Sequence, residues 1–270
     1  MQKSTAQRND PLGVVQSTSE PIKARHHSST LLGVEAVKTL LKARRSLGIT
    51  QLAKELNVSK STAHDLAAAL SSLGFVAQND QTRRYELSPE IFRFLHLIAT
   101  EFGQNRAVKS YIRAQAQRLN ATVVINALNQ RSTYVLCASG PYADTFFLGE
   151  CGPAFTGASG KALVAQLDES VWLHYAPLVS DETPSPYANR DPEKFYAELR
   201  AARASGVAWT LRERDPAMFS IAAPIRLGDR PWNQSVGLVL PYTESALGTR
   251  EALVPEIKLL AADLEELMLH

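Results

Sequence analysis

The sequence has little cysteine and no long apolar run. Two cysteines, Cys137 and Cys151, occur in 270 residues, too few for a disulfide framework or a cysteine-based zinc site. No window approaches the roughly 18 to 20 uninterrupted apolar residues of a membrane-spanning helix. The first ~30 residues also contain no apolar core of a secretion signal. We therefore expect a cytoplasmic protein that has no membrane association, no metal and no cofactor.

The motifs of common enzymes are missing as well. The sequence contains no Gly-x-Ser-x-Gly nucleophile turn and no paired-glycine phosphate loop. Cys137 or Cys151 with His174 could supply a nucleophile and a base, and Ser159 with Lys161 an activated serine. None of these has a supporting local signature, and lone cysteines in strands are usually core residues. We expect no enzymatic activity, and a redox-sensing role for the two cysteines remains an alternative.

Charge is divided unevenly along the chain. Residues 1 to 90 carry 12 lysines or arginines against 8 acidic residues, whereas the remainder carries more acidic than basic residues. A basic excess in one part favours attraction to a nucleic-acid backbone. A chain of this length usually divides into two domains.

Residues 49 to 73 carry the pattern of two amphipathic helices joined by a tight turn. Apolar residues recur at spacings of three and four on both sides of a polar break at residues 57 to 60. Ser59 is a suitable N-cap for the second helix. The first two turns of that helix are polar, and they contain Lys60, Ser61, Thr62, His64 and Asp65. A recognition helix presents its N-terminal residues to base edges in this way.

A short hairpin follows this helix pair. After Gly74 the period changes to two over residues 75 to 77 and 83 to 87, and the second of these runs contains Arg83 and Arg84. Helix-turn-helix and hairpin together predict a winged helix whose arginines meet DNA phosphates. Backbone contact from Thr50 and Gln51, at the start of the first helix, fits the same geometry. The alternative is an ordinary helical subdomain with a surface hairpin.

The flanks of this region are simpler. Residues 1 to 28 are polar without an apolar period, and we interpret them as a flexible arm. Residues 30 to 41 predict an amphipathic helix that completes a three-helix core. The helix expected over residues 89 to 102 is apolar around much of its circumference, which predicts packing against a second protein chain.

The remainder alternates between strands and helices. Strand-like runs are residues 121–128, 132–138, 145–148, 206–210, 220–227 and 236–240. Helical runs are residues 106–119, 160–167, 170–178, 192–205 and 250–269. This order predicts an α+β domain with one antiparallel sheet.

Four segments make a resemblance specific. They are LAKELNVSKSTAHDLAAALSSLGF with YELSPEIFRF, then TGASGKALVAQL, then the run from RASGVAW to SIAAPI. From about Thr30 to about Leu269 the chain resembles the IclR family of bacterial transcription regulators. The resemblance implies a winged helix-turn-helix domain over 29–88, a dimerising linker helix over 89–104 and a GAF-like effector-binding domain over 105–270. It also implies homodimers or homotetramers on double-stranded operator DNA.

The resemblance assigns DNA-contacting residues. The residues that fall where the family touches DNA are Ser59, Lys60, Ser61, Thr62 and His64 in the recognition helix, with Arg83 and Arg84 in the wing. Asp65 stands where many members have arginine. A carboxylate repels phosphate but can accept a hydrogen bond from a cytosine amino group, so this position either contributes to sequence choice or points away.

The resemblance also implies an effector pocket in the C-terminal domain. Its expected lining residues are Asp144, Phe146, Ala158, Ser159, Gly160, Met218, Ser220 and Val239. Small residues before a helix leave backbone N–H groups available to a polar ligand, and Lys161 is expected to face solvent. The final strand offers apolar side chains, which favours an aromatic or otherwise bulky effector. Family habit favours a repressor of a catabolic operon that its effector releases, although activators also occur.

Overall fold

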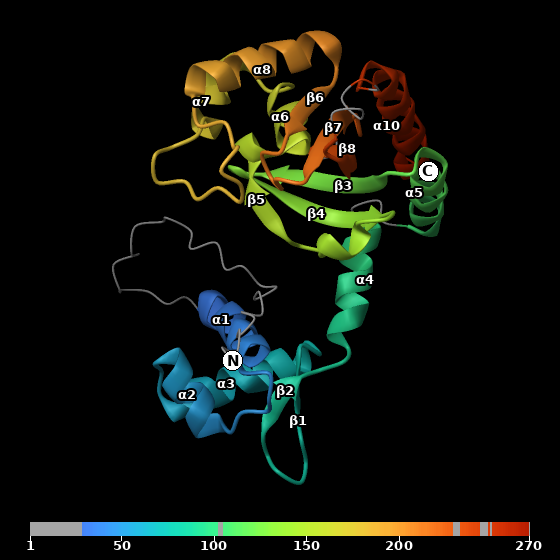
Figure 1. Ribbon diagram of the computed structural model, residues 1–270. Coiled ribbons are helices and arrows are strands. Elements are labelled where there is room, and N and C mark those ends of the chain that lie inside the picture. Colours follow the sequence, from blue (N-terminus) through green and yellow to red (C-terminus); the bar gives the residue numbers. More distant parts are fainter. Residues whose placement is uncertain (1–28, 102–104, 229–232, 244–247, 249, 270) are drawn as a thin grey trace, which may run out of the picture. The chain divides into compact units, whose positions relative to one another are not determined.

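The computed structural model describes residues 29–101, 105–228, 233–243, 248 and 250–269. The expected arm, residues 1–28, lies outside the described residues. The chain divides between Ile98 and Ala99 into two compact units (Figure 1). The α+β class expected from the sequence is confirmed.

The N-terminal unit is a three-helix core with a small wing. Its elements are α1 (Ser29–Ala43), α2 (Ile49–Leu56), α3 (Lys60–Ser72), β1 (Val76–Gln78) and β2 (Tyr85–Leu87). The strands pair antiparallel with Val76 opposite Leu87. Leu40, Leu52 and Val76 bring α1, α2 and the wing into one buried cluster. The expected helix-turn-helix and hairpin are therefore present.

Local chemistry determines where these helices end. Asn57 adopts the left-handed conformation with φ 54° and ends α2, a conformation that asparagine tolerates better than most residues. The side chain of Ser59 accepts a hydrogen bond from the Thr62 backbone N–H at 3.0 Å and so caps α3. Gly74 follows α3 with φ 74° and lets the chain turn into the wing.

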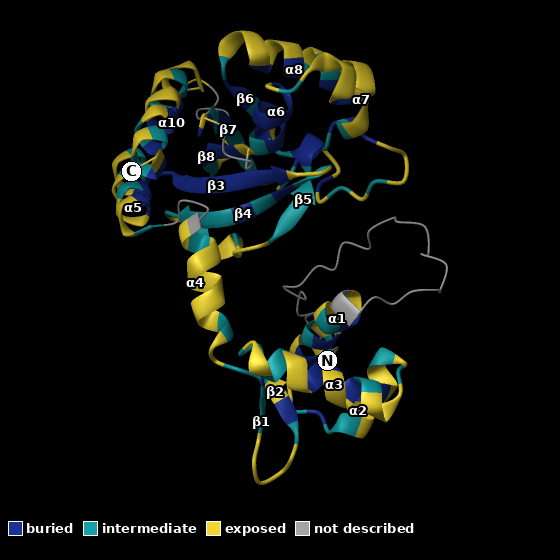
Figure 2. Ribbon diagram, turned by 180° about the vertical axis from the view of Figure 1, so that it is seen from behind, coloured by how far each residue is buried: buried dark blue, intermediate teal, exposed yellow. Residues whose placement is uncertain are grey.

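Helix α4 (Ile91–Glu101) exposes much of its apolar surface (Figure 2). Phe92 is 70% exposed and Leu97 is 66% exposed, and Phe94, Leu95 and Ile98 are exposed as well. A contiguous set of large apolar side chains in water is unfavourable for an isolated chain.

The C-terminal unit is built on one six-stranded antiparallel sheet in the order β5-β4-β3-β8-β7-β6. The strands are β3 (Thr122–Asn129), β4 (Ser132–Ser139), β5 (Cys151–Pro153), β6 (Ala208–Leu211), β7 (Met218–Ile225) and β8 (Asn233–Pro241). Both faces of the central strands are covered, since β3 is buried along seven of its eight residues. This explains why residues 121 to 128 read as a nearly continuous apolar run.

Different helices cover the two faces of the sheet (Figure 1). On one face, α5 (Arg106–Leu119) and α10 (Leu253–Leu269) pack through Ile112 and Leu260 onto Ile125 and Leu238. On the other face, α6 (Ala158–Val164) and α8 (Pro192–Ser205) pack through Leu163 and Leu199. Alternate residues of each strand point to opposite faces, so Val124, next to Ile125, faces the α6 side.

Two of the secondary-structure elements expected in the C-terminal unit are wrong. Residues 145 to 148 are not a strand: a 3-10 turn, η1 (Ala143–Thr145), precedes a loop, and the third strand is β5. Phe147 and Leu148 are exposed and Gly149 has φ 80°, so this apolar run has no sheet to join. The helix expected over 170–178 is limited to η3 (Glu169–Val171) and α7 (Trp172–Tyr175).

Helix α6 approaches the chain before it very closely. A Cβ atom added to Gly160 would lie 2.1 Å from the backbone oxygen of Ala154, in η2 (Ala154–Thr156). No side chain fits in that space, so glycine allows α6 to rest directly on the segment that leaves β5. This contact positions the start of α6 against the sheet.

We expect Gly160→Ala to lower the free energy of unfolding by about 3 kcal/mol, because the new methyl group meets backbone and cannot be accommodated by a side-chain rotation. Chemical denaturation measures the change. Gly157→Ala is the matched control: no atom lies within 4 Å of its added Cβ, and we expect a change below about 1 kcal/mol. Equal stabilities of the two variants would show that the close approach is not a constraint.

Candidate functional site

The first candidate surface is the start of α3. Lys60, Ser61, His64 and Asp65 are exposed there, and the spacings of three and four put them on one side of the helix. Thr62 is half-buried, and its hydroxyl lies 2.8 Å from that of Ser59. Ser59 and Thr62 therefore close the helix end, while the other four present the polar surface.

The two residues expected to contact DNA at the start of α2 also lie at the surface. Thr50 and Gln51 are both exposed. The Gln51 side-chain oxygen accepts from the Gly48 backbone N–H at 3.1 Å. Gln51 is therefore held in place by the helix start that it caps.

The two wing arginines, both expected to meet phosphates, have different surroundings. Arg83 is exposed at the hairpin turn and has φ 53°. Arg84 is half-buried, and its guanidinium donates to the backbone oxygen of Ser46 at 2.8 Å and to the Gln51 side chain at 2.9 Å. Arg84 thus ties the wing to the start of α2, and Arg83 is the wing arginine with its charge in solvent.

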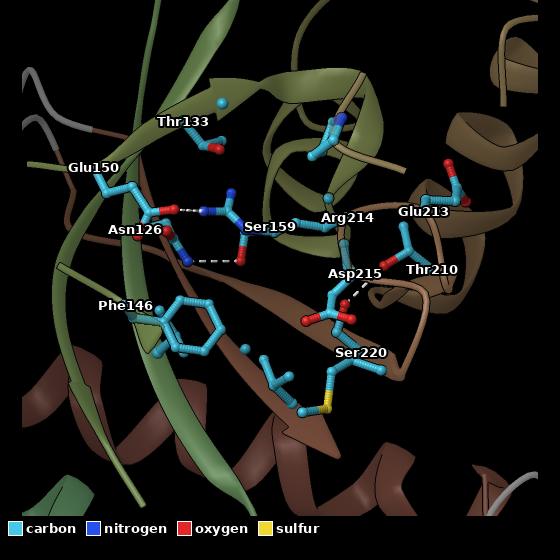
Figure 3. Close-up of a pocket in the computed structure, with 18 of the residues that line it drawn as sticks. Asn126, Thr133, Phe146, Glu150, Ser159, Thr210, Glu213, Arg214, Asp215 and Ser220 are labelled. Atoms are coloured by element: carbon cyan, nitrogen blue, oxygen red, sulfur yellow. Dashed lines mark hydrogen bonds and ion pairs between the residues drawn. The ribbon is translucent and has the colours of Figure 1, made fainter. Parts of the chain in front are cut away.

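The second candidate site is a cavity of about 300 Å³ in the C-terminal unit (Figure 3). It lies between the sheet and the start of α6. Six of the eight residues expected to line an effector pocket do line it: Phe146, Ala158, Ser159, Met218, Ser220 and Val239. Asp144 and Gly160 are not among its lining residues. Asp144 is exposed in η1, and Gly160 packs against Ala154 instead.

Hydroxyl and amide groups form two hydrogen-bonded pairs in this cavity. Thr210 and Ser220 face each other across β6 and β7 with their hydroxyl oxygens 2.7 Å apart. The Asn126 side-chain amide donates to the Ser159 hydroxyl at 2.9 Å. Figure 3 shows both pairs at the cavity wall. The register of the sheet places Thr210, Ser220 and Val239 side by side on β6, β7 and β8.

Charged groups enter the cavity from the loop after β6 and from the residue before β5. Arg214 donates to the Glu150 carboxylate at 2.6 Å, and its guanidinium carbon lies 5.8 Å from the centre of the Phe146 ring. Glu213 and Asp215 line the cavity on either side of Arg214 in sequence. The cavity is therefore more polar than the apolar final strand suggests, since none of these charges comes from β8.

The expectation that Lys161 faces solvent is wrong. Lys161 is fully buried, and its ammonium donates to Glu198 at 2.7 Å and to both carboxylate oxygens of Glu213 at 2.7 and 2.9 Å. Burial raises the pKa of Glu213 above its usual range, and the nearby Lys161 charge opposes that rise. Lys161 thereby connects α6, α8 and the loop after β6.

The arrangement of these groups also bears on the enzyme hypotheses. The Ser159 hydroxyl is engaged by Asn126 and the Lys161 ammonium by two carboxylates, so Lys161 does not activate Ser159. His174 is not among the cavity-lining residues, whereas Cys151 is. The expected catalytic pairs are therefore not assembled at this cavity.

The two cysteines are separated along the sheet. Cys151 lies opposite Tyr134, three residues along β4 from Cys137, which places their Cα atoms on the order of 10 Å apart. A disulfide requires less than about 7 Å. Burial also raises the pKa of the Cys151 thiol, which reduces its reactive thiolate form. Both observations weigh against a redox sensor that works by an internal disulfide.

Sequence reasoning missed the charged part of the cavity. Its members Glu150, Glu213, Arg214 and Asp215 occur in loops, and no local motif separates them from ordinary surface charges. One available signal was the run Arg212 to Asp215 between two strand-like segments. A dense charge run in a short connection is a candidate for a site on a loop.

Comparison with known proteins identifies two domains. A family model described as "IclR helix-turn-helix domain" matches residues 33–80, and one described as "Bacterial transcriptional regulator IclR C-terminal" matches residues 105–265. The chain is 25% identical over 209 residues to the HTH-type transcriptional regulator XynR of Escherichia coli, covering 76% of this chain and 80% of that protein. It is 22% identical over 219 residues to the p-hydroxybenzoate hydroxylase transcriptional activator of Acinetobacter baylyi, covering 77% and 79%.

A solved structure has the same fold at low identity. It is an IclR homologue from Microbacterium hydrocarbonoxydans complexed with 4-hydroxybenzoate, with a TM-score of 0.71 and 16% sequence identity. The alignment covers 89% of this chain and 99% of that chain. The C-terminal unit accordingly has the GAF-like fold that the resemblance implied.

We expect Lys161→Met to lower the free energy of unfolding by about 3 to 5 kcal/mol near neutral pH, because Glu213 then stays in the interior without a counter-charge. The pKa of Glu213 in the folded variant lies further above its value in the unfolded chain. The loss is therefore largest at high pH and shrinks as the pH falls and the carboxyl group takes up a proton.

Urea unfolding at several pH values measures this effect. In the double variant Lys161→Met/Glu213→Gln, glutamine carries no charge in the interior. We therefore expect the double variant to regain part of the free energy of unfolding that Lys161→Met loses. A loss that is independent of pH, or a double variant as unstable as the single one, would contradict the assigned role of Lys161.

Proposed function

Because the chain belongs to the IclR family of bacterial transcriptional regulators, we propose that it represses a catabolic operon in response to a small aromatic or similarly bulky metabolite. Family membership makes it a ligand-responsive DNA-binding regulator and not an enzyme. The target operon, the direction of the response and the ligand belong to the proposal.

The observation that carries the proposal is the cavity of the C-terminal unit. Its size suits a ligand of a few to a dozen heavy atoms, and such pockets combine apolar walls with few polar groups. Phe146, Met218 and Val239 supply the apolar wall. The hydroxyls of Thr210 and Ser220 can bind a polar substituent on a ring. A relative named for p-hydroxybenzoate hydroxylase and a structure with bound 4-hydroxybenzoate are consistent with a ring-shaped ligand.

We assign DNA binding to the start of α3 and to the wing. Lys60, Ser61 and His64 are exposed on the same side of α3 and suit a recognition helix that enters the major groove. Asp65 is exposed beside them, with its carboxylate 3.8 Å from the His64 ring nitrogen. It is therefore placed to accept from a cytosine amino group. Ser59 and Thr62 support this surface by capping the helix.

The exposed apolar face of α4 supports an oligomer. Phe92 and Leu97 are more than half exposed in the single chain, and a second copy of the same helix would bury them. A symmetric dimer presents two recognition helices to two operator half-sites. Dimer and tetramer both satisfy this requirement.

The regulatory mechanism we propose is a population shift. An effector changes operator occupancy only if it binds two arrangements of the oligomer with different affinity. The boundary between the two units of each chain falls within α4. This helix therefore connects the domain with the cavity covalently to the domain that we propose binds DNA. Such a regulator acts where the chromosome lies, in the cytoplasm. In the part of the chain that the structure describes, every helix is too short or too polar to cross a membrane.

Arg83 and Arg84 provide a paired test of the wing. We expect Arg83→Ala to weaken binding about equally on all DNA sequences and to reduce the salt dependence of binding by about one ion, because one phosphate contact is lost. The melting temperature of the Arg83→Ala protein should stay unchanged.

Arg84→Ala removes the hydrogen bonds to Ser46 and Gln51, so it should lower the melting temperature. Fluorescence anisotropy at several salt concentrations and thermal unfolding give the two readouts. An unchanged salt dependence in Arg83→Ala would contradict the wing assignment.

Ser220→Leu tests the effector cavity. The larger side chain extends from β7 into the cavity that Ser220 lines, so the variant should lose its ligand response and retain DNA binding. DNA selected by the protein from a random library serves as the operator, and its binding is measured with and without a panel of aromatic and short-chain carboxylic acids and amines. Ser170→Leu, at an exposed position in η3, is the control. A variant that keeps its response would place the effector elsewhere.

A further inference from the structure

The cavity carries more negative than positive charge. Four charged side chains line it, and three of them, Glu150, Glu213 and Asp215, are carboxylates, whereas Arg214 alone is cationic. Lys161 contributes a second positive charge directly behind Glu213. It is shared with Glu198, which adds one more carboxylate. A ligand that enters the cavity therefore experiences a negative potential.

Two of the three lining carboxylates already have counter-charges. Glu150 is paired with Arg214 at 2.6 Å. Glu213 holds the Lys161 ammonium through both of its oxygens and also accepts from the Asn189 backbone N–H at 3.2 Å. The charges of these two groups are therefore already balanced within the protein.

Asp215 is the carboxylate that remains. One of its oxygens accepts from the Ala217 backbone N–H at 2.8 Å. It takes part in no ion pair with any residue that the structure describes. Figure 3 shows its carboxylate at the cavity, between Arg214 and Ser220. Asp215 thus offers a negative charge to whatever occupies the space beside it.

A ligand carboxylate would be poorly matched to this arrangement. Among the lining residues its one cationic partner would be Arg214, which already pairs with Glu150 at 2.6 Å. The ligand would therefore share a single cation with Glu150 and would place a further negative charge beside Asp215. A protonated nitrogen disturbs no existing pair and neutralises the unmatched charge.

A second polar group in the cavity, the hydroxyl of Thr133, is also available to a ligand. Thr133 is 95% buried, being 5% exposed, and it lines the cavity from β4 (Figure 3). Its hydroxyl makes no hydrogen bond with any residue that the structure describes, so it is available to a ligand in the cavity. A bound molecule that reaches Thr133 would satisfy this group.

We infer that the effector carries a protonated nitrogen, which Asp215 binds, and a polar group at a distance from it, which Thr133 binds. Between them an aromatic or similarly bulky body packs against Phe146, Met218 and Val239. The effector is thus an amine, not a simple carboxylic acid. This inference rests on the proposed function, since it names the chemical class of ligand for the same cavity.

The test uses ligands that share a 4-hydroxyphenylethyl skeleton and differ in the group at the end of its side chain. Tyramine is the cation, 4-ethylphenol the neutral analogue and 3-(4-hydroxyphenyl)propionate the anion. Calorimetric titration of the full-length protein measures affinity, and thermal unfolding provides an independent readout. We expect tyramine to bind about tenfold or more tightly than 4-ethylphenol, and the anion to bind most weakly.

Asp215→Asn identifies the residue responsible. Asparagine retains an oxygen that can accept from the Ala217 N–H and removes only the charge. Tyramine should lose about tenfold in affinity in this variant, while 4-ethylphenol should be unaffected. Glu266→Gln, which removes an exposed carboxylate from α10, is the matched control and should change neither affinity.

Three results would overturn the inference. Tighter binding of the anion or of the neutral analogue than of tyramine would refute the cationic ligand, yet it would leave an effector cavity and hence the proposed function intact. Equal loss of tyramine affinity in Asp215→Asn and Glu266→Gln would show that general charge, not Asp215, attracts the amine. Failure of all three compounds to bind, together with a Ser220→Leu variant that still responds to an effector from the wider panel, would refute both proposals for this cavity.

Discussion

The C-terminal unit depends on a lysine that water cannot reach. Removing an ammonium group from water is costly, and the cost is offset only if carboxylates surround it with good geometry. Lys161 meets this condition with Glu198 and Glu213, which lie 37 and 52 residues further along the chain. The requirement therefore fixes α6, α8 and the loop after β6 relative to one another. Since Arg214 and Asp215 follow Glu213 directly, the same requirement determines which charges border the cavity.

The sequence predicted those features that neighbouring residues determine. Ser59, Asn57 and Gly74 act within a turn of their own positions, so the helix-turn-helix and its boundaries could be inferred. The strands of the sheet were mostly recovered, because their apolar runs are long and bounded by turns. Residues 145 to 148 were misassigned because an exposed apolar loop and a short strand have the same composition. Six lining residues of the cavity followed from the family resemblance, not from any local pattern.

What could not be predicted depends on contacts between distant segments. The burial of Lys161 is invisible in its own helix, where its neighbours are small and apolar. Arg84 looks like any basic residue of a wing until its bonds to Ser46 and Gln51 are seen. The cavity was expected to be less polar than it is, for a related reason. The final strand is apolar, but the charged side chains of the cavity belong to the β6–β7 loop and to Glu150. Side chains that meet only in the folded chain leave little trace in a single sequence.

Adjacent positions of the β6–β7 loop have unequal freedom to vary. Glu213 both lines the cavity and binds the buried Lys161 ammonium. A substitution of Glu213 that altered ligand choice would therefore also leave the Lys161 charge without one of its two carboxylates. Asp215, two residues later, is exposed and holds no buried partner. Evolution, or an engineer who wishes to turn this protein into a biosensor for another compound, can therefore change ligand preference at Asp215 at little cost in stability. A single loop thus combines a residue that the interior requires with a residue that is free to change, and substitutions at the second would let the same fold recognise different metabolites.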